Sequence, residues 1–318
     1  MSALEYYLRD GISKGHSPYR MVDRDFRIRV KPNITRRSIL VVAHSSSDRI
    51  FGAERSLIDV IACIDKERFD VVLALPDNNS SYVEAVRKYI DDVVFYSREW
   101  WDARKPLKES NIIIFENTIK EKKIDLVYTN TIMLNAPLVI AKKLGIPCVM
   151  HIRELIDRDE TLINHIGLSS EDIIKELSEA ADVLIANSNE TETLFRQSGK
   201  CVVVPNAIDV EGFGEAPPFS NDGILRVGML SSNIKKKGID ELHKLAIAAY
   251  KENLPMLFLA YGPETNDVRR IKKNIKSMGG PHNLLFPGYV SHPVEAIKNL
   301  DVIAVSYTHL TLPTNREV

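Results

Sequence analysis

The sequence predicts an α/β protein of two domains, each built on a doubly wound parallel sheet. Short apolar runs recur along the chain and alternate with helix-like segments, a pattern that predicts parallel strands joined by right-handed crossovers. The chain has 318 residues, and single hydrophobic cores stop growing near about 250–300 residues, so two cores are expected. Hydrophobic residues make up 44% and charged residues 27% of the chain, which leaves enough apolar side chains for both cores.

The first predicted strand is the run Ile-Leu-Val-Val-Ala at residues 39–43. Every position in it is apolar, which is typical of a strand buried on both faces. The same unit of strand, loop and helix then recurs. Further strands are predicted at 71–75, 93–95, 126–128, 148–150, 183–186 and 202–204. Parallel strands present their carboxyl ends at one edge of the sheet, so a ligand is expected at that edge.

The domain boundary is predicted at the turn Pro205-Asn206 and in the Pro-, Gly- and Ser-rich loop that follows it. Beyond this loop, strands are predicted at 225–230, 256–260, 284–286 and 302–305. The predicted domains are therefore 37–207 and 208–306, and the second is expected to be incomplete. Residues 1–36 are irregular in pattern and are interpreted as an N-terminal extension or linker.

The balance of charge excludes a general attraction to nucleic acid or to an anionic membrane. Lys and Arg total 42 against 43 for Asp and Glu, so such a partner would need a local patch. The three cysteines, Cys63, Cys148 and Cys201, are far apart in apolar stretches, which predicts buried thiols rather than disulfides or zinc ligands. The chain shows neither a secretory leader nor an apolar run near the ~18 residues of a membrane span, so a cytoplasmic location is expected.

Gly52 follows the first strand, in the segment Phe-Gly-Ala-Glu-Arg-Ser-Leu that opens the first helix. A glycine there lets the backbone and the helix N-terminus approach an anion, but it also simply permits a tight turn, and both interpretations stay open. Residues 44–48 contain no Gly-x-Gly-x-x-Gly, which disfavours a nicotinamide dehydrogenase.

His151 comes directly after the predicted strand 148–150, and Arg153 and Glu154 follow it. An imidazole and a carboxylate at the carboxyl edge of a sheet can polarise a hydroxyl, orient a sugar or share a proton. The alternative is a hydrogen-bonded structural histidine, and the residues alone do not decide between the two.

Lys237 and Gly238 lie between the first strand of the second domain and its helix. A lysine there would meet a phosphate together with the helix dipole and free backbone donors, whereas a solvated charge run is the alternative. Gly262 ends the next strand and again permits close backbone approach, although alone it indicates only a turn.

Two further features have more than one interpretation. The Asp-Arg-Asp triplets at 23–25 and 157–159 could hold a divalent cation, but neither follows a strand cleanly, so no metal site is predicted. Trp100 and Trp101, with basic residues nearby, could contact a bilayer or the face of a sugar, and partial burial beneath a loop is the alternative.

Together these features resemble the glycosyltransferases of family 4, whose fold, called GT-B, consists of two Rossmann-like domains facing a cleft. The likeness runs from about Ser38 to Ser306, and four segments carry it: 52–57, 203–209, 227–238 and 285–290. The Pro-Asn-x-x-Asp element in the second of these segments is the most specific.

The resemblance implies transfer of a sugar from a nucleoside-diphosphate-sugar to a glycan or lipid-linked acceptor, with retention of configuration and without a metal or other cofactor. It implies that His151 and Glu154 are catalytic and that Lys237 neutralises the donor diphosphate. The donor-binding residues that it implies are Gly52, Asn206, Gly228, Lys237, Gly238 and Gly262. Polysaccharide or glycolipid synthesis, with peripheral contact at the inner face of a membrane, is the setting that it suggests.

The sequence departs from the family at two places. Met229 stands where many relatives have an arginine, which removes one expected phosphate contact. Residues 307–318 do not resemble the family, whose members continue there into a glutamate-bearing loop, and they look like translated adapter sequence. We therefore expect a non-native tail, a truncated second domain and a chain that is itself inactive and prone to aggregate.

Rival functions remain open at this stage. An epimerase or a phosphorylase could use the same fold, and a nucleotide-sugar-binding subunit without catalytic activity is the alternative outside enzymes. The sugar, the nucleotide, the acceptor and the oligomeric state are not identified by the sequence.

Overall fold

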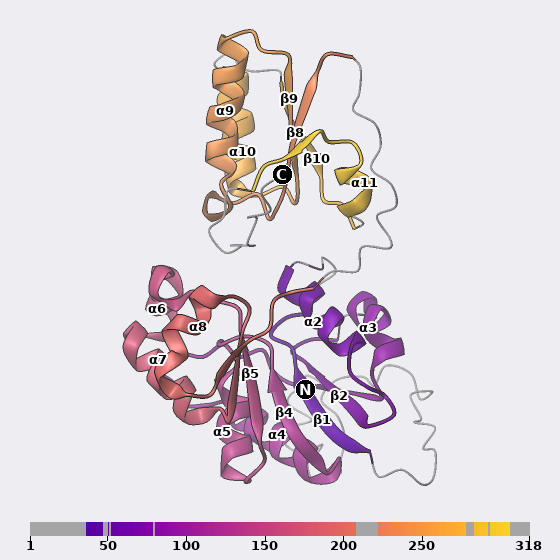
Figure 1. Ribbon diagram of the computed structural model, residues 1–318, viewed down its shortest axis with the longest axis vertical. Helices are drawn as coiled ribbons and strands as arrows, with labels where there is room; N and C mark the ends of the chain where they lie inside the picture. Colours follow the sequence, from indigo (N-terminus) through magenta and orange to yellow (C-terminus); the bar gives the residue numbers. More distant parts are fainter. Residues whose placement is uncertain are drawn as a thin grey trace, which may run out of the picture. The chain divides into compact units, whose positions relative to one another are not determined.

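A computed structural model shows two compact units, Met1–Ala207 and Ile208–Val318 (Figure 1). The structure describes residues 36–46, 50, 52–78, 80–207, 222–277, 283–291 and 293–305. The predicted extension at 1–36, apart from Arg36, and the predicted tail at 307–318 lie outside these residues.

The first unit alternates strands with helices. Its strands are β1 (Arg37–Val42), β2 (Phe69–Leu75), β3 (Asp92–Phe95), β4 (Ile124–Thr129), β5 (Cys148–Ile152), β6 (Val183–Ala186) and β7 (Cys201–Val203). Its α-helices are α2 (Gly52–Ala62), α3 (Ser80–Val86), α4 (Glu109–Glu121), α5 (Asn135–Lys143), α6 (Glu160–Ile166), α7 (Ser170–Ala180) and α8 (Asn189–Phe195). Short 3-10 turns η2 (Arg87–Tyr89), η3 (Ile156–Arg158) and η4 (Arg196–Ser198) complete the described elements of this unit.

These strands form one parallel sheet in the order β3-β2-β1-β4-β5-β6-β7. The order reverses at β1, which pairs with β2 on one side, as in Ile39 with Val71, and with β4 on the other, as in Ile39 with Leu126. The prediction of a doubly wound parallel sheet is therefore confirmed, and the carboxyl ends of β1 and β4 mark its switch point.

Two hydrophobic cores cover the two faces of this sheet because side chains alternate along each strand. On β1, Leu40 and Val42 pack with α4, α5, α7 and α8, whereas Ile39 and Val41 pack with α2 and α3. Figure 1 shows the corresponding helices in two layers around the strands. Because the sheet is buried on both faces, its ligands are expected at the edges.

The second unit has the same plan on a smaller scale. Its described elements are β8 (Leu225–Leu230), η6 (Lys235–Lys237), α9 (Ile239–Lys251), β9 (Met256–Tyr261), α10 (Asn266–Ser277), β10 (Leu284–Gly288), α11 (Pro293–Ile297) and β11 (Val302–Ile303). The sheet order is β10-β9-β8-β11, with parallel pairs throughout. Its core lies between the sheet and helices α9 and α10, and Met229 is buried there.

Two local predictions need correction, and the burial of the tryptophan pair is now determined. Cys63 is exposed and Cys201 is half-buried, so only Cys148 is the predicted buried thiol. His151 lies inside β5 rather than after it, because the strand continues through the pairing of His151 with Ile185. Of the tryptophan pair, Trp101 is buried, whereas Trp100 is 46% exposed.

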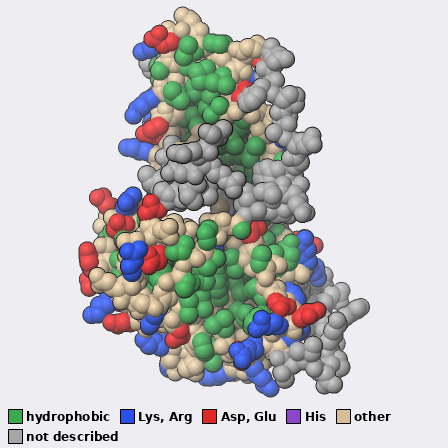
Figure 2. Space-filling view, in the orientation of Figure 1, with side chains coloured by type: hydrophobic (Ala, Val, Ile, Leu, Met, Phe, Trp, Pro, Cys, Tyr) green, Lys and Arg blue, Asp and Glu red, His purple; other side chains and the backbone are tan. Residues whose placement is uncertain are grey.

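The visible surface carries Lys and Arg side chains interspersed with Asp and Glu, as expected from the near-zero net charge (Figure 2). Apolar side chains gather in the middle of the visible face of each unit. Within the part of the chain that the structure describes, no helix is long and apolar enough to cross a membrane.

Candidate functional site

The guanidinium of Arg153 is the centre of a polar network at the carboxyl edge of the first sheet. Its Nε donates to Asn130 Oδ1 at 2.8 Å, and its Nη1 donates to Ser56 Oγ at 2.7 Å and to Asn206 Oδ1 at 2.9 Å. Ser56 Oγ also donates to Asn206 Oδ1 at 2.9 Å. One planar side chain therefore fixes three others that lie up to 97 residues away in sequence.

Each member of this network follows or faces the end of a strand. Arg153 comes directly after β5, Asn130 directly after β4 and Asn206 shortly after β7, while Ser56 lies in the second turn of α2. The sheet order places β1, β4 and β5 side by side, so the segments that follow them meet at one edge. Asn130 Nδ2 also donates to the carbonyl of Ala53 at 3.2 Å, which ties α2 to this edge.

The Arg153 guanidinium supplies a positive charge to this edge of the sheet. Among the described residues its guanidinium forms no salt bridge, and its hydrogen-bond acceptors are neutral. Burial lowers the pKa of the half-buried Arg153, and the Glu154 and Asp59 carboxylates raise it in part. A partly desolvated guanidinium with neutral partners is suited to an anionic or strongly polar ligand.

The imidazole of His151 is buried beside this charge. Its Nδ1 lies 2.6 Å from the Tyr128 hydroxyl and 3.4 Å from Arg153 Nη2. Burial, with a further contribution from Arg153, lowers the pKa of His151 to about 3. The ring is therefore neutral across the physiological range, and its buried Nε2 has no hydrogen-bond partner among the described residues.

The lowered pKa of His151 predicts an acid-side loss of stability. Below its ordinary pKa of 6.5, His151 binds a proton in the unfolded chain, whereas in the folded chain it stays neutral down to about pH 3. The unfolding free energy therefore keeps its full value above pH 6.5 and falls as the pH drops toward 3. His151→Asn removes this titration. Between pH 7 and pH 5, wild-type unfolding free energy should fall by about 1–2 kcal/mol more than that of the variant. Urea unfolding at the two pH values measures this, and equal losses in both proteins would contradict it.

Glu154 faces the backbone rather than the imidazole. Its Oε2 accepts from the backbone N–H of Arg153 at 3.0 Å and of Ile132 at 3.4 Å. Burial raises the pKa of the Glu154 carboxyl, although these donors lower it in part. This geometry fixes the turn after β5 against the segment after β4, and a catalytic role for Glu154 stays a prediction.

A second histidine, His44, lies at the same edge after β1. Its Nε2 is 3.9 Å from Glu54 Oε1, and Glu54 is buried in α2. Burial lowers the pKa of His44; Glu54 raises it, and Arg153 and Arg98 lower it. Gly52, at the start of the same helix, is exposed, and a Cβ added there would meet nothing within 4 Å. Gly52 is thus near this edge without being required by packing.

In the second unit, Lys237 and Gly238 lie at the start of α9. Lys237 ends the 3-10 turn η6, and Gly238 takes the N-cap position of α9 with a left-handed φ of 81° and no side-chain capping bond. The first N–H groups of this 13-residue helix therefore have no side-chain cap. A helix start with an adjacent lysine is a place where an anion is stabilised.

The two other predicted glycines of this unit have packing roles. A Cβ on Gly262 would lie 2.0 Å from the backbone oxygen of Ser231 and 2.7 Å from Asn233 Nδ2, in the loop that leads to Lys237. A Cβ on Gly228 would lie 2.1 Å from Leu300 Cδ1. Gly262 therefore lies at the carboxyl edge, whereas Gly228 lies within β8, packed beneath Leu300.

The predicted site residues thus form two groups, each within one unit. His151, Glu154 and Asn206 gather around Arg153 in the first unit, and Lys237, Gly238 and Gly262 gather after β8 and β9 in the second. No role was predicted for Arg153 from the sequence, and Ser56, Asn130 and His44 were not predicted as site residues. Their position directly after strands, or in the first helix, was the available signal.

Among the residues that the structure describes, no group of three or more His, Cys, Asp or Glu side chains is arranged to hold a metal ion. The triplet at 157–159 lies in and beside η3, where Arg158 is paired with Asp157 at 3.9 Å. The triplet at 23–25 lies outside the described residues.

Two units of this kind, each with a parallel sheet and a polar carboxyl edge, define the GT-B class of glycosyltransferase folds. Solved structures of that class are similar to this chain. HepE (Alr3699) of Anabaena, solved with UDP and glucose, is 18% identical, with 85% of this chain and 74% of that chain covered and a TM-score of 0.63. TarM is 11% identical, with 86% and 80% covered and a TM-score of 0.63. The lipopolysaccharide outer core galactosyltransferase WaaB, in its apo form, is 15% identical, with 85% and 74% covered and a TM-score of 0.58.

The family model for Glycosyltransferase Family 4 matches residues 50–211, which is half of the chain. The protein belongs to this family, as the resemblance of its motifs predicted. No curated protein sequence matches the chain.

Proposed function

We propose that this family 4 protein transfers a sugar from a nucleoside-diphosphate-sugar to a glycan or lipid-linked acceptor, with retention of configuration and without a metal ion. The observation that carries the proposal is the Arg153 network, which holds a half-buried guanidinium, hydrogen-bonded to neutral acceptors, and a neutral His151 at the carboxyl edge of the first sheet. HepE, which has a similar fold, was solved in complex with UDP and glucose, and this favours a nucleoside-diphosphate-sugar as the ligand.

The neutral His151 has a role that a charged imidazole could not fill. A neutral ring has one N–H donor and one acceptor nitrogen, and the Tyr128 hydroxyl at 2.6 Å occupies Nδ1. Its Nε2 is buried without a hydrogen-bond partner among the described residues, and it bonds a hydroxyl of the sugar once neighbouring side chains move aside. Arg153 contributes by disfavouring protonation of the ring, so the hydrogen bond to the substrate persists at neutral and mildly acidic pH.

Lys237 is proposed to meet the diphosphate of the donor. The charge that develops on the leaving diphosphate is stabilised by a cation and by free N–H groups at a helix start, and the beginning of α9 supplies both kinds of group. Gly262 keeps the neighbouring loop close to this point.

Removing the Lys237 ammonium is expected to weaken binding of the donor. Lys237→Ala should raise the Kd for a nucleoside diphosphate at least about tenfold, because a charge-assisted contact is lost. Titration calorimetry with UDP, GDP and ADP measures this. The matched control is Lys244→Ala, which removes an exposed lysine from the same helix α9. Equal affinities in the two variants would show that Lys237 does not contact the diphosphate.

Product analysis tests the reaction itself. The protein is incubated with a UDP-sugar and an oligosaccharide acceptor, with and without EDTA, and products are identified by NMR. A glycosidic product with the donor's anomeric configuration, formed equally with EDTA, supports the proposal and contradicts the expectation that this chain is itself inactive. Inverted products or dependence on a metal would correct the mechanism, and an epimerised nucleotide sugar would establish the rival isomerase activity.

A further inference from the structure

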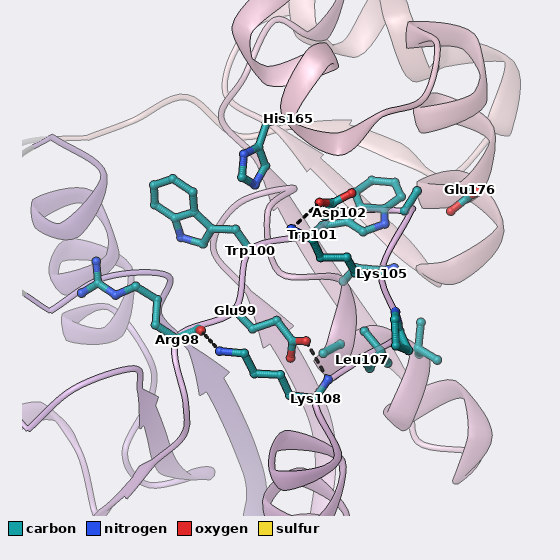
Figure 3. A pocket seen from close by; sticks show the side chains of 15 residues that line it. Arg98, Glu99, Trp100, Trp101, Asp102, Lys105, Leu107, Lys108, His165 and Glu176 are labelled. Carbon is teal, nitrogen blue, oxygen red and sulfur yellow. Dashed lines mark hydrogen bonds and ion pairs between the residues drawn. The ribbon is translucent and has the colours of Figure 1, made fainter.

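A cavity of about 580 Å³ opens on the first unit, between the segment that follows β3 and the helices α5, α6 and α7 (Figure 3). The segment 98–108 supplies most of its lining, and His165 of α6 and Glu176 of α7 close the opposite side. The backbone N–H of Trp101 donates to the carbonyl of Met133 at 2.9 Å, which holds the segment to the chain after β4. The volume is within the range of small-molecule sites.

An indole ring forms one wall of this cavity. Trp100 is 46% exposed, an unusual exposure for the largest aromatic side chain, and its ring lies edge-on to the His165 ring at 5.8 Å between centroids. Trp101, by contrast, is buried in the core beneath it. Figure 3 shows Trp100 and His165 side by side at the cavity. The exposed indole is thus held in place by its neighbours.

Fixed polar groups lie around this ring. Glu99 accepts from the backbone N–H of Lys108 at 2.7 Å and from Asn111 Nδ2 at 2.6 Å, so its carboxylate has a set position. Asp102 is held in the same way by Arg104 at 2.7 Å and Lys105 at 2.9 Å. The half-buried Glu99 carboxylate keeps further lone pairs for a ligand, whereas the buried Asp102 carboxylate fixes the segment itself.

We propose that this cavity is a saccharide-binding subsite that holds part of a glycan acceptor. A pyranose ring has an apolar face of C–H groups that stacks on an indole, while its hydroxyls bond to carboxylates and ammonium groups around the rim. The assignment of the glycan as an acceptor rests on the proposed function. Saccharide binding itself rests only on the cavity, the exposed Trp100 and the fixed Glu99 carboxylate.

The same features disfavour a membrane surface as the occupant. An anionic bilayer attracts clustered Lys and Arg, but here Glu99, Asp102 and Glu176 line the cavity beside the basic side chains. The indole of Trp101 is buried and could not enter a bilayer without unfolding its surroundings. Concave, mixed-charge walls fit an uncharged polyhydroxyl ligand better than a flat acyl surface.

The chain offers a direct probe of this cavity. It contains two tryptophans, Trp100 and Trp101, so all of its indole fluorescence originates there. Titration with cellobiose, maltose and N,N′-diacetylchitobiose should give a saturable change in tryptophan emission for at least one disaccharide, with a Kd of about 1 mM. No response to any of the three would overturn the proposal.

Variants of exposed aromatic residues separate a binding site from a general surface effect. By calorimetry, Trp100→Ala should raise the Kd of the responding disaccharide about tenfold, and Trp100→Phe should raise it less. Tyr250→Ala is the matched control, because Tyr250 is 44% exposed on α9 of the other unit. Circular dichroism spectra confirm that each variant is folded, and equal affinities in Trp100→Ala and Tyr250→Ala would contradict the proposal.

Two further titrations, with lipid vesicles and with nucleotides, test other ligands. Vesicles of equimolar phosphatidylcholine and phosphatidylglycerol should leave the emission unchanged, and a Trp100-dependent response to vesicles without one to disaccharides would replace the saccharide with a membrane. UDP, GDP and ADP binding is measured in parallel. Disaccharide binding without nucleotide binding would support the saccharide subsite and contradict the proposed function. Nucleotide binding without disaccharide binding would contradict the subsite and leave the proposed function standing.

Discussion

Replacing Arg153 by methionine is expected to lower the unfolding free energy of the first unit by about 2–4 kcal/mol. The substitution removes donors to Asn130, Ser56 and Asn206 and leaves the buried Asn130 and the half-buried Ser56 without this partner. Methionine keeps much of the apolar volume, so the loss reports on the polar network rather than on a cavity. The same change should raise the pKa of His151, because the Arg153 charge contributes to lowering it.

Urea unfolding and NMR titration of the imidazole measure these two effects. Arg68→Met is the control, since Arg68 is an exposed arginine of the same unit that lies over the Phe69 ring, and a change within about 0.5 kcal/mol is expected there. Arg153→Lys should be intermediate because it keeps the charge but loses the planar fork. A loss for Arg153→Met no larger than that for Arg68→Met would show that the network does not hold this edge together.

Gly262→Ala is expected to lower the unfolding free energy of the second unit by about 3–5 kcal/mol. The new Cβ would lie 2.0 Å from the backbone oxygen of Ser231, which cannot move as a flexible side-chain end can. The backbone also has a φ of 152°, a conformation that side chains rarely adopt. Relief of the clash would displace the loop between β8 and Lys237, so nucleoside diphosphate binding should weaken as well.

A neighbouring glycine separates conformational strain from the clash. Gly288 has a φ of 99°, but a Cβ there would meet nothing within 4 Å. Gly288→Ala should therefore cost about 1–3 kcal/mol, from backbone strain alone. Thermal unfolding and calorimetric titration of both variants give the comparison. If Gly262→Ala costs no more than Gly288→Ala, close packing against Ser231 is not the reason for a glycine at 262.

The fold was predictable because it depends on a pattern that many residues repeat. Runs such as 39–43 are apolar at every position, and that feature is found in strands covered on both faces. The end of β5 was misplaced by two residues, since the polar His151 and the isoleucine after it look like the start of a loop. Pairing of His151 with Ile185 in β6 determines the end of the strand, and the sequence of β5 alone does not contain that information.

The site was predictable in position but not in its contacts. That polar residues after β5 and before α9 would lie at the carboxyl edges of the two sheets follows from parallel pairing. The central role of Arg153 depends on Asn206, which is 53 residues away, and on Ser56, which is 97 residues away. Gly228 shows the opposite case, because its glycine is accounted for by the later Leu300 rather than by a ligand. Both outcomes are set by tertiary packing between distant segments.

The most direct test of the proposed donor site is amide hydrogen exchange in the presence and absence of UDP, GDP or ADP. With the nucleotide that binds, exchange should slow at the backbone amides of 235–242, where η6 meets α9. The amides of 262–267, after β9, should be protected to a smaller extent. Unchanged exchange across both segments with all three nucleotides, or protection confined to other parts of the chain, would contradict a diphosphate site at the start of α9.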